Sequence, residues 1–152
     1  MAEPLSLKES AEYLLQECRM VLPGIQALFG FQLVAVFDAD FRRDLSLSMQ
    51  RLHLVAIGLI AVAVAMVMSP AAFHRQTGSN SVTKTFLLVS ARLLLWSMIP
   101  LATAICLDFY LIASIMIPGP IAALCAIVLA AVFVVAWFAL PRWKRLANFV
   151  AR

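Results

Sequence analysis

Four long apolar segments restrict the folds that are open to this chain. They cover about residues 20–37, 49–68, 86–117 and 121–140. A helix needs about 20 apolar residues to cross a bilayer, and the hydrocarbon core leaves few alternatives because it cannot satisfy exposed backbone groups. Charged residues make up only 13% of the chain. We therefore expect an all-α integral membrane protein that folds as a four-helix bundle.

An amphipathic segment precedes the first span. Ser6 and Glu9 have the spacing of a capping box, which predicts that a helix begins near Leu7. Pro23 is expected to kink this helix where it enters the membrane, since proline lacks a backbone N–H. We expect residues 1–152, including this N-terminal extension, to form a single membrane domain. Prolines are also expected to end the second span, at Ser69-Pro70, and the fourth, at Pro141.

A polar stripe follows the first helix into the membrane. Residues three and four positions apart share one helix face, and this spacing is unbroken over the whole segment. Lipid does not tolerate such a stripe, so it requires protein or water beside it. The polar stripe consists of Glu9, Glu12, Gln16, Arg19, Pro23, Gln26 and Gly30, and the opposite, apolar stripe of Leu7, Ala11, Leu14, Cys18 and Leu22.

Charged residues at membrane depth have two interpretations. Glu17, or Glu12, is placed to pair with Arg92 of the third span, because a buried arginine requires a carboxylate or several carbonyls. The alternative is a charged gate at the mouth of a path. Asp108 either pairs with Arg51 or His53 or acts alone as a proton or cation site.

Two glutamines lie deeper in the first span. Gln26 belongs to the polar stripe, whereas Gln32 is about 120° away from it on the helix. An amide can hydrogen-bond across helices, so both are interpreted as helix contacts, one toward the bundle and the other toward a second subunit. For Gln26 the alternative is that it lines a pore.

The cationic residues indicate an orientation in the membrane. The net charge of +4 comes from residues next to apolar spans, so anionic lipid is the expected partner and nucleic acid is not. Loops rich in lysine and arginine stay in the cytoplasm, which favours cytoplasmic termini. One side collects Lys8, Arg19, Arg75, Lys84, Arg92, Arg142, Lys144, Arg145 and Arg152, and the other has Arg42, Arg43 and Arg51.

The C-terminal tail is expected to lie on the membrane surface. One apolar face, which includes Trp143, is flanked by basic residues, and this pattern is typical of a short interfacial helix on anionic headgroups. The residues assigned to the lipid interface are Arg142, Trp143, Lys144 and Arg145.

Catalytic and metal-binding patterns are missing from the sequence. It has no serine elbow, paired catalytic acids, glycine-rich phosphate loop or redox CxxC motif. Cys18, Cys106 and Cys125 lack metal-ligand spacing, and cysteines in apolar segments usually pack as small hydrophobes. We expect a protein that is not an enzyme and holds no cofactor or metal.

Three motifs carry a resemblance to a known family. They are Glu17-x-Arg19, then Gly24-x-Gln26-x-Leu28-Phe29-x-Phe31, and finally Pro70-x-x-x-His74-Arg75. The chain resembles a family of small bacterial four-helix membrane proteins with a domain of unknown function. The likeness covers most of residues 9–110 and departs from the family at Gln32, where an apolar residue is more common. It implies a bacterial inner-membrane protein and supplies no activity.

Two functions fit these features. The first is a homo-oligomeric channel or transport-type protein for an ion or small solute, with the first-span polar stripe lining the path. The alternative is an accessory or scaffold subunit of a membrane complex, with the stripe closing the bundle or docking a partner. Small four-span exporters are a weaker third interpretation, because their acid lies near mid-depth of the first span and here the carboxylates end at Glu17.

Overall fold

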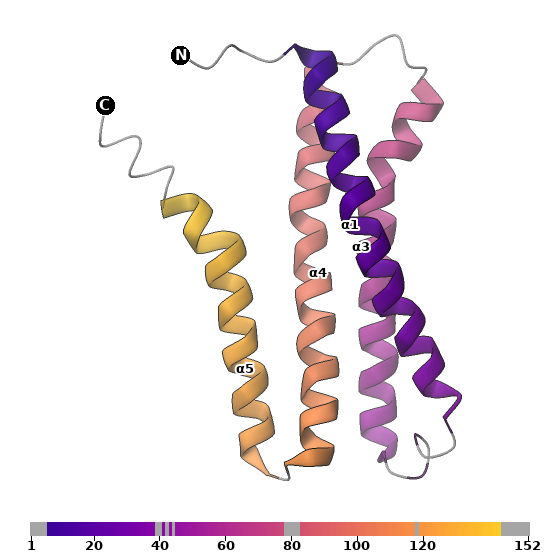
Figure 1. Cartoon of the computed structure of the whole chain (residues 1–152), viewed down its shortest axis with the longest axis vertical. Helices are drawn as coiled ribbons and strands as arrows, with labels where there is room; N and C mark the ends of the chain where they lie inside the picture. Colours follow the sequence, from indigo (N-terminus) through magenta and orange to yellow (C-terminus); the bar gives the residue numbers. More distant parts are fainter. Residues whose placement is uncertain are drawn as a thin grey trace. The chain divides into compact units, whose positions relative to one another are not determined.

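The computed structural model describes residues 6–38, 41, 43, 45–77, 83–117 and 119–143. Its helices are α1 (Leu7–Val36), α3 (Leu47–Thr77), α4 (Lys84–Met116) and α5 (Pro120–Val134), and α5 runs directly into the π-helical turn η1 (Val135–Ala139) (Figure 1). Four helices among these residues are long and apolar enough to cross a membrane: Leu7–Val36, Leu47–Gln76, Lys84–Met116 and Pro120–Trp143. The all-α class, with four helices able to span a membrane, is thereby confirmed.

The chain divides into two compact units, Met1–Leu101 and Ala102–Arg152. The first unit contains α1, α3 and the beginning of α4. The second contains the end of α4, α5 and η1. The polar stripe of the first helix lies wholly in the first unit, whereas Asp108 and the C-terminal basic residues belong to the second.

α1 and α3 pack side by side and run in opposite directions (Figure 1). Each helix buries one stripe of residues three and four positions apart, as expected for helices that share a long seam. Many of these residues are small, so the two backbones can approach closely. The buried residues are Ala11, Leu14, Cys18, Ile25 and Gln32 on α1, and His53, Ala56, Ile60, Ala63, Val67 and Pro70 on α3.

The beginning of α4 packs on the end of α3 through aromatic rings. Phe86 is buried, and its ring stacks on Phe73 with 5.7 Å between centroids and 16° between planes. His74 also contacts Phe86, at 5.9 Å. Ser90 and Ser97 are buried further along α4, on the same face as Phe86 by their spacing. Through this face, the beginning of α4 packs within the first unit.

Two of the predicted helix ends were wrong, both at prolines. α3 continues through Pro70 to Thr77, and the last helix passes Pro141 and reaches Trp143. A proline removes only its own N–H and disturbs one turn, so a helix continues where apolar packing or an altered turn compensates. Pro70 is fully buried. Before Pro141, η1 widens the helix, with the Leu140 N–H donating to the Val135 carbonyl.

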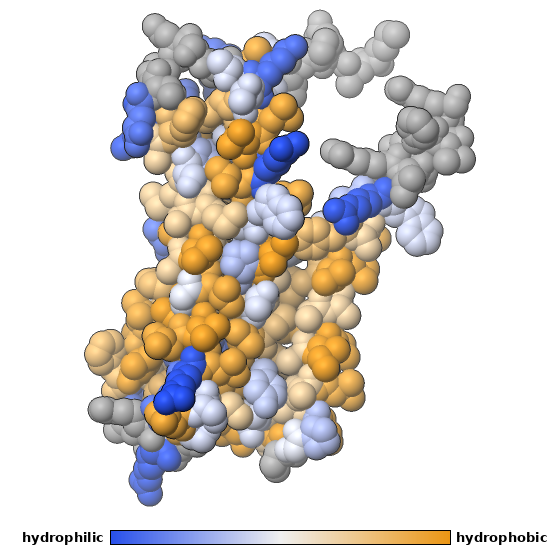
Figure 2. Space-filling view, turned by 180° about the vertical axis from the view of Figure 1, so that it is seen from behind, coloured by the Kyte–Doolittle hydropathy of each residue, from blue (hydrophilic) through white to orange (hydrophobic). Residues whose placement is uncertain are grey.

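Large apolar side chains cover much of the exposed surface. Phe31 is 76% exposed, and Val34 and Leu54 are each 68% exposed. Figure 2 shows hydrophobic side chains over most of the visible face. Water-soluble monomers rarely expose apolar patches of this extent. The surface is therefore one that contacts a lipid bilayer, as expected for a multi-pass membrane protein.

Candidate functional site

The first turn of α1 has a complete capping box, as predicted. The Ser6 N–H donates to Glu9 Oε2 at 2.8 Å, and the Glu9 N–H donates to Ser6 Oγ at 3.2 Å. Hydrogen bonds from the Ser6 side chain and backbone lower the pKa of the Glu9 carboxyl from its ordinary value of 4.5. α1 has 30 residues and is about 45 Å long, whereas the hydrocarbon core is about 30 Å thick. Its first turns therefore project beyond the core.

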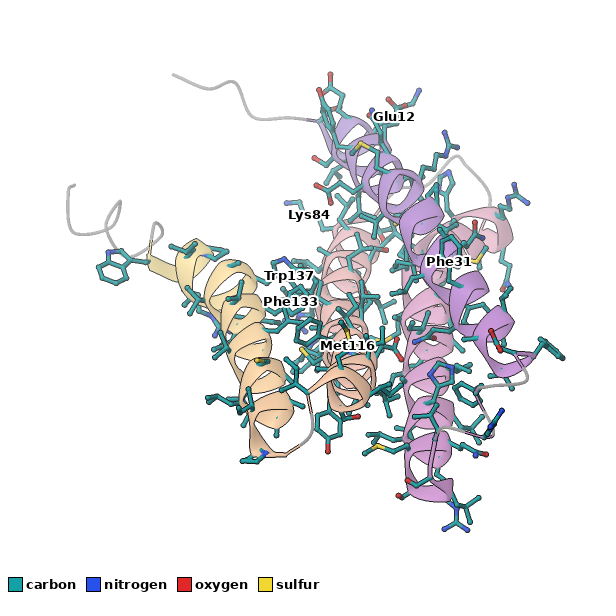
Figure 3. All side chains as sticks on the ribbon, turned by 60° about the horizontal axis from the view of Figure 1, so that its bottom comes forward. Glu12, Phe31, Lys84, Met116, Phe133 and Trp137 are labelled. Atoms are coloured by element: carbon teal, nitrogen blue, oxygen red, sulfur yellow. The ribbon has the colours of Figure 1, made fainter. Side chains whose placement is uncertain are left out.

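The polar stripe of α1 is exposed along its length, whereas the opposite stripe supplies the buried residues of the helix, Gln32 among them. Glu12 and Phe31, both labelled in Figure 3, lie near the two ends of this helix. We call the exposed set the outward stripe. It consists of Glu12, Gln16, Arg19, Gln26 and Gly30.

Two members of the outward stripe lie at membrane depth. At 1.5 Å per residue, Gln26 is about 15 Å and Arg19 about 26 Å from Val36, the last residue of α1. For a core about 30 Å thick that begins at Val36, Gln26 is near mid-membrane and Arg19 near the opposite boundary. Gly30 leaves open space, because apart from its own helix backbone and chain neighbours no atom lies within 4 Å of the position that a Cβ would take.

A groove lies between α1 and α3 on the Arg19 side of the membrane. Its volume is about 540 Å³. Cys18, Leu22 and Val67 give it an apolar floor. Three basic side chains line it as well, one from α1 and two from the last turns of α3. These are Arg19, His74 and Arg75. We call this cavity the α1–α3 groove.

Small side chains explain why the groove forms at this place. Ala71 and Ala72 follow Pro70 on α3, and Cys18 faces them from α1. None of these side chains is long enough to fill the space between two helices whose axes are typically 8–10 Å apart. The basic residues are long, so they reach along the groove while keeping their charged ends at the polar boundary.

A buried polar contact joins α1 and α3 toward their other ends. His53 Nε2 lies 3.1 Å from the backbone carbonyl oxygen of Gln32, to which it can donate. Both residues are buried, at 7% and 5% exposure. The ring of Phe41 packs on the His53 ring with 5.0 Å between centroids. Gln32 therefore faces the interior of the first unit and Gln26 faces outward.

The predicted cluster of Glu17 and Arg92 is not assembled within the described residues. Both side chains are exposed, and no ion pair joins them in the part of the chain that the structure describes. Glu17 leaves α1 on its exposed side, whereas Arg92 lies on α4 two residues from the buried Ser90. A contact of Arg92 with a carboxylate therefore stays a prediction.

The remaining predicted residues belong to the second unit. Asp108 is half-buried on α4, and its pairing with Arg51 or His53 stays a prediction. Arg142 and Trp143 are exposed in the last helical turn, as a lipid-interface role requires. Lys144 and Arg145 lie outside the described residues. Phe133 and Trp137, labelled in Figure 3, lie one turn apart with their ring centroids 4.6 Å from each other and their planes tilted by 51°.

Two features of the site were not predicted, namely the contact between His53 and Gln32 and the α1–α3 groove. The sequence contained a signal for each of them. Gln32 continues the buried stripe of α1, seven residues after Ile25, and His53 begins the buried stripe of α3, three residues before Ala56. Extending each stripe would have brought these polar residues to the seam. The groove had a weaker signal, namely the small residues Ala71 and Ala72 beside Arg75.

The side chains that commonly bind metals form no metal centre among the residues that the structure describes. No group of three or more His, Cys, Asp or Glu side chains is placed to hold an ion there. Cys18, Cys106 and Cys125 are free thiols. The candidate site offers the amide of Gln26 for hydrogen bonding and the basic groove residues for charge pairing.

Comparison with known proteins places the chain in a family. A family model described as a family of unknown function (DUF6328) matches residues 7–141. The match includes the fourth span, in which the sequence offered no recognisable motif. No curated protein and no solved structure matches the chain.

Proposed function

Because this chain belongs to DUF6328, a family of unknown function, we propose its role from its own geometry. We propose a homo-oligomeric channel or transport-type protein in which the outward stripe of α1 lines a polar path. The observation that carries this proposal is the exposure of Gln26 near mid-membrane, on a helix whose opposite face is already packed on α3.

Lipid is an unfavourable neighbour for the outward stripe. An amide in hydrocarbon lacks hydrogen-bond partners, whereas a facing protein group or water supplies them. The α1 helix of one chain offers one such stripe, and a path needs polar groups around an axis. Several copies with their α1 helices around one axis would provide these groups. An ion or small solute is the expected passenger.

The charges suggest how the path is oriented. Glu12 and Gln16 precede Arg19 on the exposed face, outside or at the boundary of the hydrocarbon core. Glu12 and Glu17 would form the mouth of the path, and Arg19, Gln26 and Gly30 would line its interior. The excess of lysine and arginine on this side supports cytoplasmic termini in a bacterial inner membrane. The proposed role is not catalytic and uses no cofactor.

A second candidate function rests on Gly30. The open space at this residue and the exposed Ala27 beside Gln26 would let a helix of another protein approach closely. The outward stripe would then dock a partner, and the chain would be an accessory or scaffold subunit. In that case Gln26 contacts a different protein and not water.

Cysteine chemistry at position 26 tests the path. Gln26→Cys is introduced into a chain whose three native cysteines are replaced by alanine, and the protein is reconstituted in vesicles. We expect disulfide-linked dimers between copies and a rapid reaction with a water-soluble, membrane-impermeant thiol reagent. The reason is that only a thiol in contact with water forms the reactive thiolate.

The matched control is Gln32→Cys, in the same helix but buried against α3. It should neither cross-link nor react. Cross-linking at position 26 without reaction would mean a dry contact between copies and would overturn the path. Absence of cross-linking would overturn the homo-oligomer and favour the accessory role.

A further inference from the structure

Apart from Arg19, which also belongs to the outward stripe, the α1–α3 groove is lined by residues that the proposed path does not use. Its basic side chains come from two helices that are far apart in the sequence, and its floor is apolar. His74 and Arg75 lie on α3, away from the outward stripe of α1. The groove is therefore a candidate binding site separate from the path.

The position of the groove in the membrane narrows the choice of occupant. Arg19 is about 26 Å along α1 from Val36, so it lies near the boundary of a hydrocarbon core about 30 Å thick. Arg75 lies in the last turn of α3, about 42 Å from the start of that helix at Leu47 and so beyond the core. The groove thus extends from the headgroup layer into the upper hydrocarbon.

The chemistry of the lining matches an amphipathic anion. Guanidinium groups bind phosphate oxygens through paired N–H donors, and His74 adds an imidazole at the same end. Leu22 and Val67 offer the deeper part of the groove an apolar surface suited to an acyl chain. Basic pockets between membrane helices on one side of the bilayer are a recurrent site for acidic lipid headgroups.

We infer that the α1–α3 groove binds an anionic phospholipid, with its phosphate held by Arg19 and Arg75 and its acyl chain against the apolar floor. The volume of about 540 Å³ is in the range of small-molecule sites, about 300–1,000 Å³. It accommodates a headgroup and the first part of a chain. A phosphate bound there would also hold the start of α1 to the end of α3.

Native mass spectrometry of the full chain tests this site. The protein is released from detergent after incubation with equal amounts of phosphatidylglycerol and phosphatidylcholine. We expect preferential retention of one phosphatidylglycerol per chain. Arg75→Gln and Arg19→Gln should each weaken this binding about tenfold, because each removes charge-assisted hydrogen bonds to the phosphate.

Lys84→Gln is the matched control. Lys84 is exposed at the start of α4, outside the groove lining (Figure 3), and this substitution lowers the net charge of +4 by the same single unit. It should leave phosphatidylglycerol binding within about twofold of the parent. Equal weakening by all three variants would indicate attraction by net charge alone and would overturn the site.

Two further outcomes would also contradict the inference. Equal retention of the two lipids would show that the headgroup charge is not recognised. Displacement of the lipid by millimolar inorganic phosphate or glycerol phosphate would assign the groove to a free anion. Circular dichroism of Arg75→Gln checks that its helices are intact. The two proposals share Arg19 but are tested separately, because Gln26→Cys tests the path at a residue outside the groove lining.

Discussion

At the scale of single residues, the two glutamines of α1 have opposite environments. Gln26 and Gln32 are six positions apart, which rotates one about 120° from the other. Gln26 is exposed, whereas Gln32 is buried and its carbonyl lies 3.1 Å from His53 Nε2. The same side-chain chemistry is therefore available for a path at one position and enclosed within the helix pair at the other.

His53→Ala should destabilise the first unit. The substitution removes a buried hydrogen bond and the ring that packs on Phe41. We expect a loss of about 1–3 kcal/mol in the free energy of unfolding, measured by titrating the folded protein in micelles with sodium dodecyl sulfate and following helix content.

The neighbouring substitution Leu54→Ala is the control, since Leu54 is 68% exposed. It removes a large side chain without opening the seam, and its effect should stay within about 0.5 kcal/mol. Equal losses in both variants would show that the contact between His53 and Gln32 contributes nothing specific.

At the scale of helices, the start of α1 depends on a local charge. Ser6 hydrogen bonds lower the pKa of Glu9, so the folded state favours the carboxylate. A carboxyl with a depressed pKa contributes stability above its unfolded value of 4.5, and this contribution is lost as the pH falls through its folded pKa. The first turn of α1 should therefore loosen below about pH 4.5 and not at neutral pH.

Ser6→Ala tests this dependence. Carbon-13 NMR of the labelled carboxyl should give a pKa for Glu9 below 4.5 in the parent protein and a value closer to 4.5 in the variant. At neutral pH the Glu9 amide should exchange about fivefold faster in the variant, because its cap acceptor is gone. Glu12, on the same exposed face, is the internal reference. The same change in the carbon-13 signal of its carboxyl would argue against a specific cap.

At the scale of the whole molecule, the proposed topology has four spans and both termini on one side of the membrane. The distribution of lysine and arginine then favours the cytoplasm for that side. Apolar exposed side chains along all four helices, such as Ile112 at 60% and Ile127 at 65% in the second unit, are consistent with lipid around the chain.

Accessibility of single cysteines tests this orientation. In a chain without native cysteines, Ser46→Cys lies between α1 and α3, and Ser10→Cys lies in the first turns of α1. An impermeant maleimide added to intact spheroplasts should label position 46 and leave position 10 unlabelled until the membrane is opened. The reverse pattern would place the termini outside and would invalidate the count of basic residues as a guide.

Local and compositional signals predicted most of the fold. Apolar length identified the four spans, and the capping box identified the start of α1, because both depend on residues close together in the chain. The helix ends predicted at Pro70 and Pro141 were wrong. Packing compensates for the lost N–H at Pro70, and a π-helical turn precedes Pro141, so both helices continue. For the candidate site, the outward stripe of α1 was predicted as a polar face, and its exposure followed from the apolar stripe opposite.

The sequence by itself determined that this is an all-α membrane protein with one polar and one apolar face on its first helix, since helical period and hydrophobic length need no knowledge of neighbours. Only the tertiary structure decided which residues meet across the seam. His53 meets Gln32 at one end of the helix pair, and Arg19 shares a groove with Arg75 at the other. These pairings depend on the register of two antiparallel helices, which is set by how their small residues interdigitate along the whole interface.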